Sequence, residues 1–246
     1  MRETILDIVK HTGSLGFIEA VKVTGDDDTT FVEAMDNDRT VIIKADLLKA
    51  DPSLKGEFGM SYLPLLQGLL TYPNFKTDGA TIDVVRKERA NRGLVPEEIL
   101  FKDEKGQTAS YRLMSSELIP EQAKFLGTNW DVEVDPSLSK IKEFQALAGL
   151  YGSFENYFLA KTVDGELRFY IGDEGSSMHR AFLTIAEGVT GSLGGELHWP
   201  ISQVLSILKL GQEENLKLQF SSRGALQITM TSPYAEYRFI LPARKK

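Results

Sequence analysis

The chain of 246 residues contains no cysteine and only three histidines. The absence of cysteine excludes disulfide bonds and thiolate metal sites, and it fits a reducing compartment such as the cytoplasm. His11, His179 and His198 are far apart in the sequence, and none belongs to a short zinc-ligand spacing such as H-x-x-x-H. We therefore expect neither a bound metal nor a cofactor.

Long hydrophobic runs are also missing. The apolar stretch from Leu63 to Leu70 is interrupted by Pro64 and Gln67, and it is too short to cross a bilayer. Asp7 stands where the apolar region of a signal peptide would lie, so we expect no secretion. Hydrophobic residues make up 42% and charged residues 26%, as in a soluble globular protein without a membrane partner. The length suits one large domain or two of about 120 residues.

Sequence motifs for catalysis are absent as well. The chain has no G-x-S-x-G segment for a serine nucleophile. The glycine-rich segment Thr190–Gly195 lacks the Lys-Ser/Thr pair of a phosphate-binding loop and precedes a predicted strand instead of a helix. Carboxylates are plentiful, so an enzyme with a catalytic acid pair remains an alternative. We expect a protein that is not an enzyme and has no catalytic residues.

The chain does contain a recurring pattern of helix and strands. Pro64, Pro136 and Pro200 each stand between an extended segment and an amphipathic segment, and proline suits the first turn of a helix. With a further helix near the N-terminus, the apolar spacing predicts helices at 3–11, 63–72, 136–149 and 200–210. Short β-like segments follow each helix, so a unit of helix and β-meander is used about four times. This pattern predicts an α+β fold.

Alternating segments joined by turn residues predict the strands. The Asp164-Gly165 pair predicts a tight hairpin, and the acidic clusters Gly25–Asp28 and Asp36–Asp38 suit turns, with a cation site as the alternative. We expect domains at 1–117 and 128–246, joined by an extended connector at 118–127. The predicted strands are 16–24, 29–35, 39–46, 79–86, 99–103 and 108–114 in the first half, and 129–135, 155–162, 166–172, 179–187, 194–199, 215–221, 225–231 and 235–241 in the second.

Charge is distributed unevenly along the chain. The total is -7, which argues against an open nucleic-acid binder, yet the helices, counted as residues 1–11, 63–72, 136–149 and 200–210, hold five basic and three acidic residues. Side by side, such helices would form a mildly positive surface, and ordinary solvated helix faces are the alternative. The segment Arg86–Pro96 carries four basic residues and is predicted to be a polar loop, either solvated or in contact with a phosphate backbone. The basic helix residues are Arg2, Lys10, Lys140, Lys142 and Lys209.

Four features resemble the two-domain DNA polymerase sliding clamps, as in PCNA and the clamps of T-even bacteriophages. Ala34–Ile43 is similar to the PCNA segment that turns between two strands after a Met-Asp pair. Leu118–Gln122 resembles the interdomain connector, and the helices at Pro136 and Pro200 occupy the expected places. Ala235–Arg244 is similar to the last strand of the family. The order of elements matches over the whole length.

The resemblance implies two similar clamp domains per chain, each with two helices on antiparallel sheets, and a homotrimeric ring of six domains. Such a ring encircles double-stranded DNA without sequence specificity and tethers the replicative DNA polymerase, after loading by an ATP-dependent clamp loader. Topological linkage removes the need for a strongly basic surface, so a charge of -7 is compatible with this function. The likeness to bacteriophage clamps suits the cytoplasm of a host cell. A β-rich structural or assembly protein of a virus particle, with no DNA inside it, is the alternative.

Three sets of site residues follow from the resemblance. The DNA-facing set is Arg2, Lys10, Lys140, Lys142 and Lys209, although the helix at 63–72 has no Lys or Arg where PCNA has some. The subunit interface would join two edge strands head to tail, with two protected edges of a monomer as the alternative. Its residues are Thr108, Ser110, Arg112 and Met114 on one strand, and His179, Ala181, Leu183 and Ile185 on the other. A pocket for an aromatic or aliphatic plug of a partner peptide would be lined by Met35, Arg39, Thr40, Leu118, Ile119, Pro120, Leu241, Pro242 and Ala243.

Overall fold

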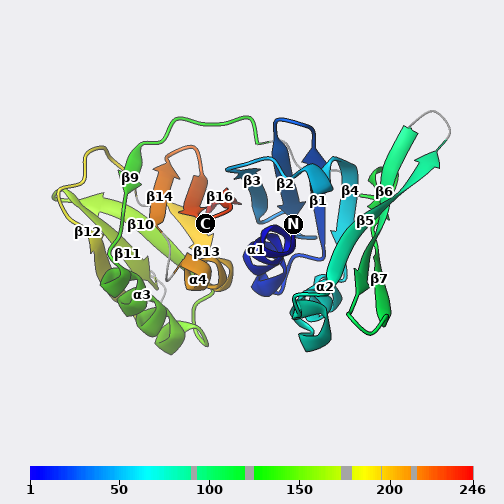
Figure 1. The fold of residues 1–246 in the computed structure, drawn as a ribbon. Helices are drawn as coiled ribbons and strands as arrows, with labels where there is room; N and C mark the ends of the chain where they lie inside the picture. The colour runs from blue at the N-terminus through cyan, green and yellow to red at the C-terminus, as the bar shows by residue number, and fades with distance from the viewer. Residues whose placement is uncertain (90–92, 120–124, 173–178, 195, 212–214, 246) are drawn as a thin grey trace. The chain divides into compact units, whose positions relative to one another are not determined.

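The computed structural model describes residues 1–89, 93–119, 125–172, 179–194, 196–211 and 215–245 (Figure 1). The chain divides into two compact units. Unit 1 is Met1–Lys124 together with Ser232–Tyr237, and unit 2 is Phe125–Thr231 together with Arg238–Lys246. The two units follow each other along the chain as expected, except that Ser232–Tyr237, a short piece of the last hairpin, belongs to unit 1. Half of the predicted connector at 118–127, residues 120–124, lies outside the described residues.

Unit 1 contains two adjacent helices, a large antiparallel sheet and a smaller one. The large sheet has the order β8-β4-β1-β2-β3, and Ser232–Tyr237 lies beside β3, where the Leu48 N–H donates to the Tyr234 carbonyl at 2.8 Å. The smaller sheet has the order β5-β6-β7. The elements are α1 Arg2–Thr12, β1 Ala20–Gly25, β2 Thr30–Met35, β3 Ile42–Leu47, β4 Gly56–Ser61, α2 Leu63–Thr71, β5 Thr81–Arg89, β6 Gly93–Lys102, β7 Thr108–Arg112 and β8 Met114–Ser115.

Unit 2 repeats this plan with two helices and two sheets. One sheet has the order β16-β15-β14-β9 and the other β12-β11-β10-β13-β17. The first three residues of β16 belong to unit 1. The elements are β9 Val132–Val134, α3 Leu138–Tyr151, β10 Tyr157–Val163, β11 Glu166–Ile171, β12 Ala181–Ala186, β13 Leu197–Pro200, α4 Ile201–Leu210, β14 Asn215–Ser221, β15 Ala225–Thr231, β16 Ala235–Pro242 and β17 Arg244–Lys245.

The four predicted helices are all present, but their starts differ from the prediction. Only Pro64 lies in the first turn of its helix. Pro136 precedes α3 by two residues, because the side chain of Ser137 caps that helix and accepts a hydrogen bond from the Lys140 N–H at 3.3 Å. Pro200 is the N-cap residue of α4. No helix in the described part of the chain has both the length and the hydrophobicity required to span a membrane.

The turn predictions are confirmed. Asp164 and Gly165 both have positive φ and connect β10 to β11, as a two-residue hairpin requires. In the first acidic cluster, the Asp26 carboxylate accepts hydrogen bonds from the backbone N–H groups of Asp28 and Thr29. These bonds lower the pKa of Asp26 below its usual value. The carboxylate therefore stabilises its own turn.

The prediction of a polar loop at Arg86–Pro96 is wrong. β5 continues to Arg89 and β6 begins at Gly93, so the segment forms the end of a long hairpin. The pattern was misleading because charged residues stand opposite apolar ones across the hairpin, such as Lys87 opposite Val95 and Glu88 opposite Leu94. The Glu97 carboxylate lies 2.9 Å from the Arg89 guanidinium and 4.0 Å from the Lys87 ammonium.

The core of unit 2 explains why its helices lie against one face of the sheets. Phe144 of α3 makes edge contacts with Phe158 and Phe169, and Trp199 packs on Phe158 and Phe220. All five side chains are almost fully buried. This apolar face of α3 leaves the opposite face, with its charged residues, to solvent.

Candidate functional site

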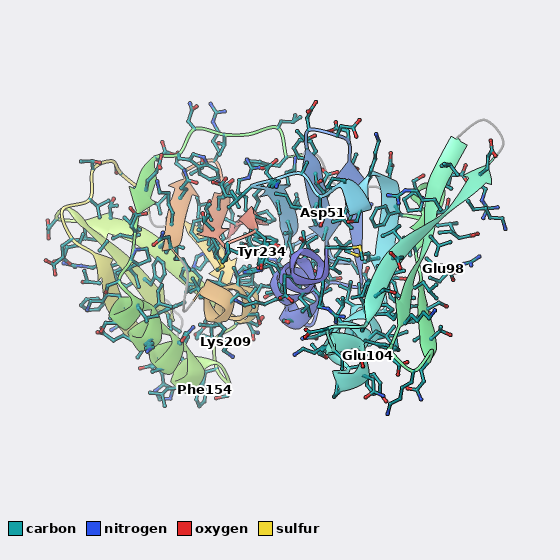
Figure 2. The ribbon with its side chains drawn as sticks, in the orientation of Figure 1. Asp51, Glu98, Glu104, Phe154, Lys209 and Tyr234 are labelled. Carbon is teal, nitrogen blue, oxygen red and sulfur yellow. The ribbon has the colours of Figure 1, made fainter. Side chains whose placement is uncertain are left out.

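The basic helix residues fall into three groups. Lys142 on α3 and Lys209 in the last turn of α4 are exposed, and neither forms an ion pair within the described residues. Figure 2 labels Lys209 at α4. Lys10 is exposed near the end of α1. Lys140 forms an ion pair with Glu143 at 2.9 Å, one turn further along the same helix. Lys142 and Lys209 are therefore exposed helix cations that an anionic ligand can reach without breaking an ion pair of the described residues.

Arg2 has a different role. Its guanidinium donates to the carbonyl oxygen of Leu70, at 2.5 Å, and to that of Phe75. A cation suits this position because the last carbonyls of α2 have no partner within the helix. Burial lowers the pKa of Arg2, with Glu3 acting weakly in the opposite direction. Arg2 therefore ties α1 to the end of α2, and we leave it out of the candidate DNA-facing set.

α2 presents an apolar surface. Leu65 is 56% and Tyr72 47% exposed, and the helix contains no Lys or Arg. Its apolar residues line an open groove of about 740 Å³ beside the beginning of β7. The groove is lined by Pro64, Leu65, Gly68, Leu69, Tyr72, Phe75, Gln107, Thr108 and Ala109. A helix of this kind offers nothing that attracts a phosphate.

A second cavity, of about 720 Å³, lies within unit 1. It is lined by residues from the loop after α1, from the turn between β2 and β3, and from the start of α2. Leu118 and Met114 close one side of it. Its lining combines apolar side chains such as Ile18 and Met35 with the polar backbone of two turns. The arrangement suits a short segment with an apolar side chain.

The turn between β2 and β3 gives this cavity a fixed wall. The buried Asp36 carboxylate accepts hydrogen bonds from the backbone N–H groups of Thr40 and Val41, both at 2.7 Å. Arg39 and Tyr62, which both line the cavity, have positive φ of 57° and 52°. A non-glycine residue in this region is strained, and such strain is concentrated at functional sites. We take this as support for a binding role.

The cavity contains part of the predicted peptide pocket. Met35, Arg39 and Leu118 line it. Thr40 instead supports the turn, and Ile119 covers Gly59 of β4, where a Cβ atom would lie 2.9 Å from the Ile119 side chain. The predicted Pro120 lies outside the described residues. Leu241, Pro242 and Ala243 belong to unit 2, and of these Leu241 is fully buried.

Sequence reasoning missed the cavity residues Ile18, Tyr62 and Pro64. Ile18 follows α1 by several residues, and no local pattern connects it with Met35. Tyr62 was assigned only as the residue before a helix. Its left-handed backbone was not predicted, because tyrosine carries none of the preference that glycine or asparagine has for that region.

The predicted interface strands both lie at sheet edges. β7 is the last strand of β5-β6-β7, and β12 is the first of β12-β11-β10-β13-β17. The Leu113 N–H donates to the Glu97 carbonyl at 2.9 Å, and hydrogen-bonded pairs alternate along an antiparallel ladder. The backbone groups of Thr108, Ser110 and Arg112 therefore point away from β6. Their side chains are exposed too.

Some predicted interface residues lie elsewhere. Met114 belongs to β8, which pairs with β4, and it lines the cavity. His179 precedes β12 and contacts the Phe154 ring, with ring centroids 5.4 Å apart. Ile185 faces the core and is buried. Ala181 and Leu183 lie on β12 and are half-buried.

The exposed side of β12 carries an aromatic residue that sequence reasoning missed. Phe182 stacks on Tyr170, with ring centroids 5.6 Å apart, and the Arg168 guanidinium lies 5.5 Å from the Phe182 centroid. Hydrogen bonds from Arg168 and Thr184 lower the pKa of Glu166, so its carboxylate ties β11 to the edge strand. This edge is thus rigidly supported.

Comparison with solved structures identifies the fold. A. fulgidus PCNA, solved with the C-terminal region of FEN-1 bound, has a TM-score of 0.71 at 8% identity over 100% of this chain and 97% of that chain. The chain has the fold of a PCNA sliding clamp. Entamoeba histolytica proliferating cellular nuclear antigen has a TM-score of 0.68 at 12% identity, covering 99% of this chain and 96% of that one. The PCNA2–PCNA3 complex of Sulfolobus tokodaii gives 0.64 at 13% identity over 100% and 97%.

The likeness to the PCNA clamps lies in the fold and not in the sequence, since the identities are 8–13%. No protein-family model matches the chain, and no curated protein matches it. The predicted α+β fold of two clamp domains is nevertheless confirmed by the solved structures. The agreement extends over both halves, because the coverage is nearly complete in each pair of chains.

Proposed function

We propose that this protein is a DNA sliding clamp that tethers a replicative DNA polymerase, and that it is not an enzyme. The observation that carries the proposal is the PCNA clamp fold over the full length of the chain. The two edge strands β7 and β12 support it, since one lies in each unit and a head-to-tail pairing of identical subunits needs two different edges. Three subunits would close a ring of six clamp domains.

The proposed ring holds DNA by topology more than by charge. Lys10, Lys142 and Lys209 would provide a few weak phosphate contacts. Lys140 would contribute less, because its ammonium already forms an ion pair with Glu143. Few contacts keep the salt-dependent binding energy small, so the ring can move along the duplex without sequence preference. The total charge of -7 disfavours unspecific binding of the outer surface to DNA. An ATP-dependent loader would open the ring around its substrate.

The cavity of unit 1 is the proposed docking site for partner proteins. A. fulgidus PCNA is solved with the C-terminal region of FEN-1 bound to it. In this chain the cavity beside Leu118 has the size and the apolar lining for a segment with one aromatic or aliphatic plug. The DNA polymerase and the loader would use the same site in turn.

The ring is tested by mass and by topology. Light scattering across a dilution series should give a mass near three times 27.4 kDa at high concentration. The protein is then mixed with nicked circular plasmid. An amine-reactive crosslinker joins the protein subunits to one another, and the plasmid is washed with concentrated salt. We expect covalent rings to stay on the circular plasmid and to leave it after linearisation, because salt cannot break a topological link.

Two results would contradict this proposal. A monomer at every concentration would exclude a self-closing ring of this chain. Equal retention on circular and linear DNA would show ordinary binding instead of a topological link. Bovine serum albumin, crosslinked in the same way, controls for trapping in the plasmid.

The docking site yields a separate prediction. Replacing Met35 by glutamate places a charge on the apolar wall of the cavity. We expect a fluorescent peptide of the FEN-1 C-terminal region to bind with micromolar affinity, and M35E to weaken it by about tenfold or more. Fluorescence anisotropy measures both. Glu33→Ala, on the same strand but outside the cavity lining, should bind like the wild type. Equal binding by M35E would place the peptide elsewhere.

A further inference from the structure

The two units differ at one edge of their sheets. β5 and β14 hold the same place in the order of elements, because each is the first strand after the second helix of its unit. β14 pairs with β15 on one side and with β9 on the other. β5 pairs with β6 in the long hairpin of Figure 1, and within the described residues no strand pairs with its other edge. The place that β9 fills in unit 2 is therefore open in the described part of unit 1.

β9 closes one side of the core of unit 2. Val132 of this strand stands opposite Phe220 of β14. Val134 stands opposite Leu218, and all four side chains are buried. Successive side chains of a strand point to opposite faces, so the two valines are on the inner face together. A short strand with two valines is thus enough to cover this edge.

The corresponding side chains of β5 have no such cover. Ile82 of β5 stands opposite Phe101 of β6. Val84 stands opposite Ile99, and both side chains of β6 are fully buried, so this side of β5 belongs to the inner face as well. Ile82 and Val84 themselves are only half-buried. A further strand with two apolar residues would bury them as β9 buries its partners.

The backbone of β5 also has hydrogen-bonding groups that face this open edge. Bonds alternate along the middle strand β6, and Asp103 at its end bonds toward β7, so Leu100 bonds to its partner Asp83 on β5. The backbone groups of Ile82 and Val84 therefore point away from β6. An edge with such outward groups is a template for pairing with another extended chain.

Arg86 marks one end of the open edge. Its guanidinium donates to the carbonyls of Ser53 and Lys55, and over a long distance of 3.4 Å to the outward carbonyl of Val84. After Arg86 the strand carries only charged residues, which are typical of edges that resist pairing. The first half, Thr81–Val85, has four β-branched residues and a single charge. This half lacks the usual protection of an edge.

We propose that the Thr81–Val85 edge of β5 binds an extended segment of a partner protein, which adds one antiparallel strand to the sheet. In this mode of recognition, main-chain hydrogen bonds provide affinity and alternate side chains provide specificity. Two β-branched apolar residues of the segment would cover Ile82 and Val84. The edge belongs neither to β7 nor to the cavity beside Leu118, so this inference goes beyond the proposed clamp and does not depend on its ring.

The residue between the two apolar positions of the segment should be a cation. It would stand opposite Asp83, whose carboxylate is exposed. In unit 2 the corresponding outer pair is polar, because the Gln219 amide donates to the Glu133 carboxylate at 3.1 Å. The carboxylate of Asp83 also repels the phosphates of DNA, which leaves a protein segment such as Val-Lys-Val as the fitting occupant.

A second copy of this chain fits the edge less well than a different protein. Its segment Val21–Val23 reads Val-Lys-Val, but this segment lies in β1 and pairs with β2 on one side and with β4 on the other. A folded copy therefore does not offer it. The same five-residue sequence, Ala20–Thr24, is a suitable synthetic probe once it is free of the fold.

Amide hydrogen exchange of the full-length protein, followed by NMR, tests the site. Without peptide, the amides of Ile82 and Val84 should exchange rapidly, because they point to solvent. Millimolar acetyl-Ala-Val-Lys-Val-Thr-amide should slow both by at least tenfold and leave Asp83, which bonds to β6, unchanged. The matched peptide acetyl-Ala-Val-Glu-Val-Thr-amide should bind at least threefold more weakly, because its carboxylate meets that of Asp83.

Charge reversal provides the matched control. D83K changes an exposed side chain, so the protein should stay folded, and it should bind the glutamate peptide more tightly than the lysine peptide. D38K reverses an exposed carboxylate in the turn between β2 and β3, and it should keep the preference of the wild type.

Three results would overturn the proposal. Unchanged exchange at millimolar lysine peptide would mean that the edge does not accept a strand. Slow exchange of Ile82 and Val84 without peptide would mean that the chain itself covers the edge. Protection that increases with protein concentration would identify a second copy as the occupant. Each of these results leaves the proposed ring standing, because the mass of the trimer and its retention on circular DNA are measured independently.

Discussion

Replacing Ser110 by proline is expected to prevent assembly of the ring while leaving the monomer folded. The Ser110 N–H points away from β6, so proline removes no hydrogen bond of the monomer. It does remove the donor in the middle of the free edge, and its ring blocks the close approach of another strand. We expect the concentration required for trimer formation to rise by about a hundredfold or more. Light scattering measures it.

Two further variants show whether an effect of S110P on assembly comes from the lost backbone N–H or from the lost side chain. Ser110→Ala keeps the N–H and should assemble like the wild type. Ala109→Pro removes a donor that faces β6, so it should destabilise the monomer itself, by about 3 kcal/mol. Assembly of S110P at wild-type concentrations would mean that β7 is not the subunit edge. Retention on circular plasmid should fall together with assembly, because an open chain has no topological link.

The second large effect is expected at Asp7, a buried carboxylate of α1. Its Oδ2 accepts hydrogen bonds from the Ser232 hydroxyl and the Tyr237 hydroxyl, both at 2.8 Å. Asp7→Ala leaves both hydroxyl groups without this acceptor inside the protein. We expect a loss of about 3 kcal/mol in the free energy of unfolding, because each buried hydrogen bond to a charged group contributes about 1.5–3 kcal/mol. Urea unfolding followed by circular dichroism measures the loss.

Neighbouring variants show whether the loss arises from this cluster. Tyr237→Phe removes one donor and should cost about 1–2 kcal/mol, less than Asp7→Ala. Glu3→Ala, an exposed acidic residue of the same helix, should change the stability by less than about 0.5 kcal/mol. A similarly small change for Asp7→Ala would show that water or another group replaces the carboxylate. The stacking of His11 on Tyr237, with ring centroids 4.1 Å apart, and the backbone hydrogen bond between Leu48 and Tyr234 would then still hold the segment.

The elements of this protein were largely predictable from the sequence, because they depend on local patterns. The apolar spacing in α3 and α4 predicted both helices, and Asp164-Gly165 predicted its hairpin. The end of the β5–β6 hairpin was missed, since charged residues such as Lys87 and Glu88 stand opposite Val95 and Leu94 there, instead of two strands of alternating apolar residues. Helix starts were displaced where a capping side chain such as Ser137 competed with a proline.

The candidate sites were only partly predictable, because they join residues that no local pattern connects. Met35, Arg39 and Leu118 were named for the peptide pocket and do line one cavity, but Ile18 and Tyr62 beside them were not foreseen. Arg2 was counted as a DNA-facing cation from its charge. Its position next to the end of α2 gives it carbonyl partners instead, and a count of charges does not show such partners.

The sequence by itself determined the class of this protein: an α+β chain without thiols, with four helices, a recurring helix-and-meander plan and a net charge of -7. These properties follow from composition and from the periods of 3.6 and 2 residues that helices and strands impose. Only the tertiary structure decided which helix cations form no ion pair within the described residues and which apolar side chains stay exposed on α2. Those properties depend on contacts between residues far apart in the chain, such as Tyr111 with Ser61 and Asp7 with Tyr237.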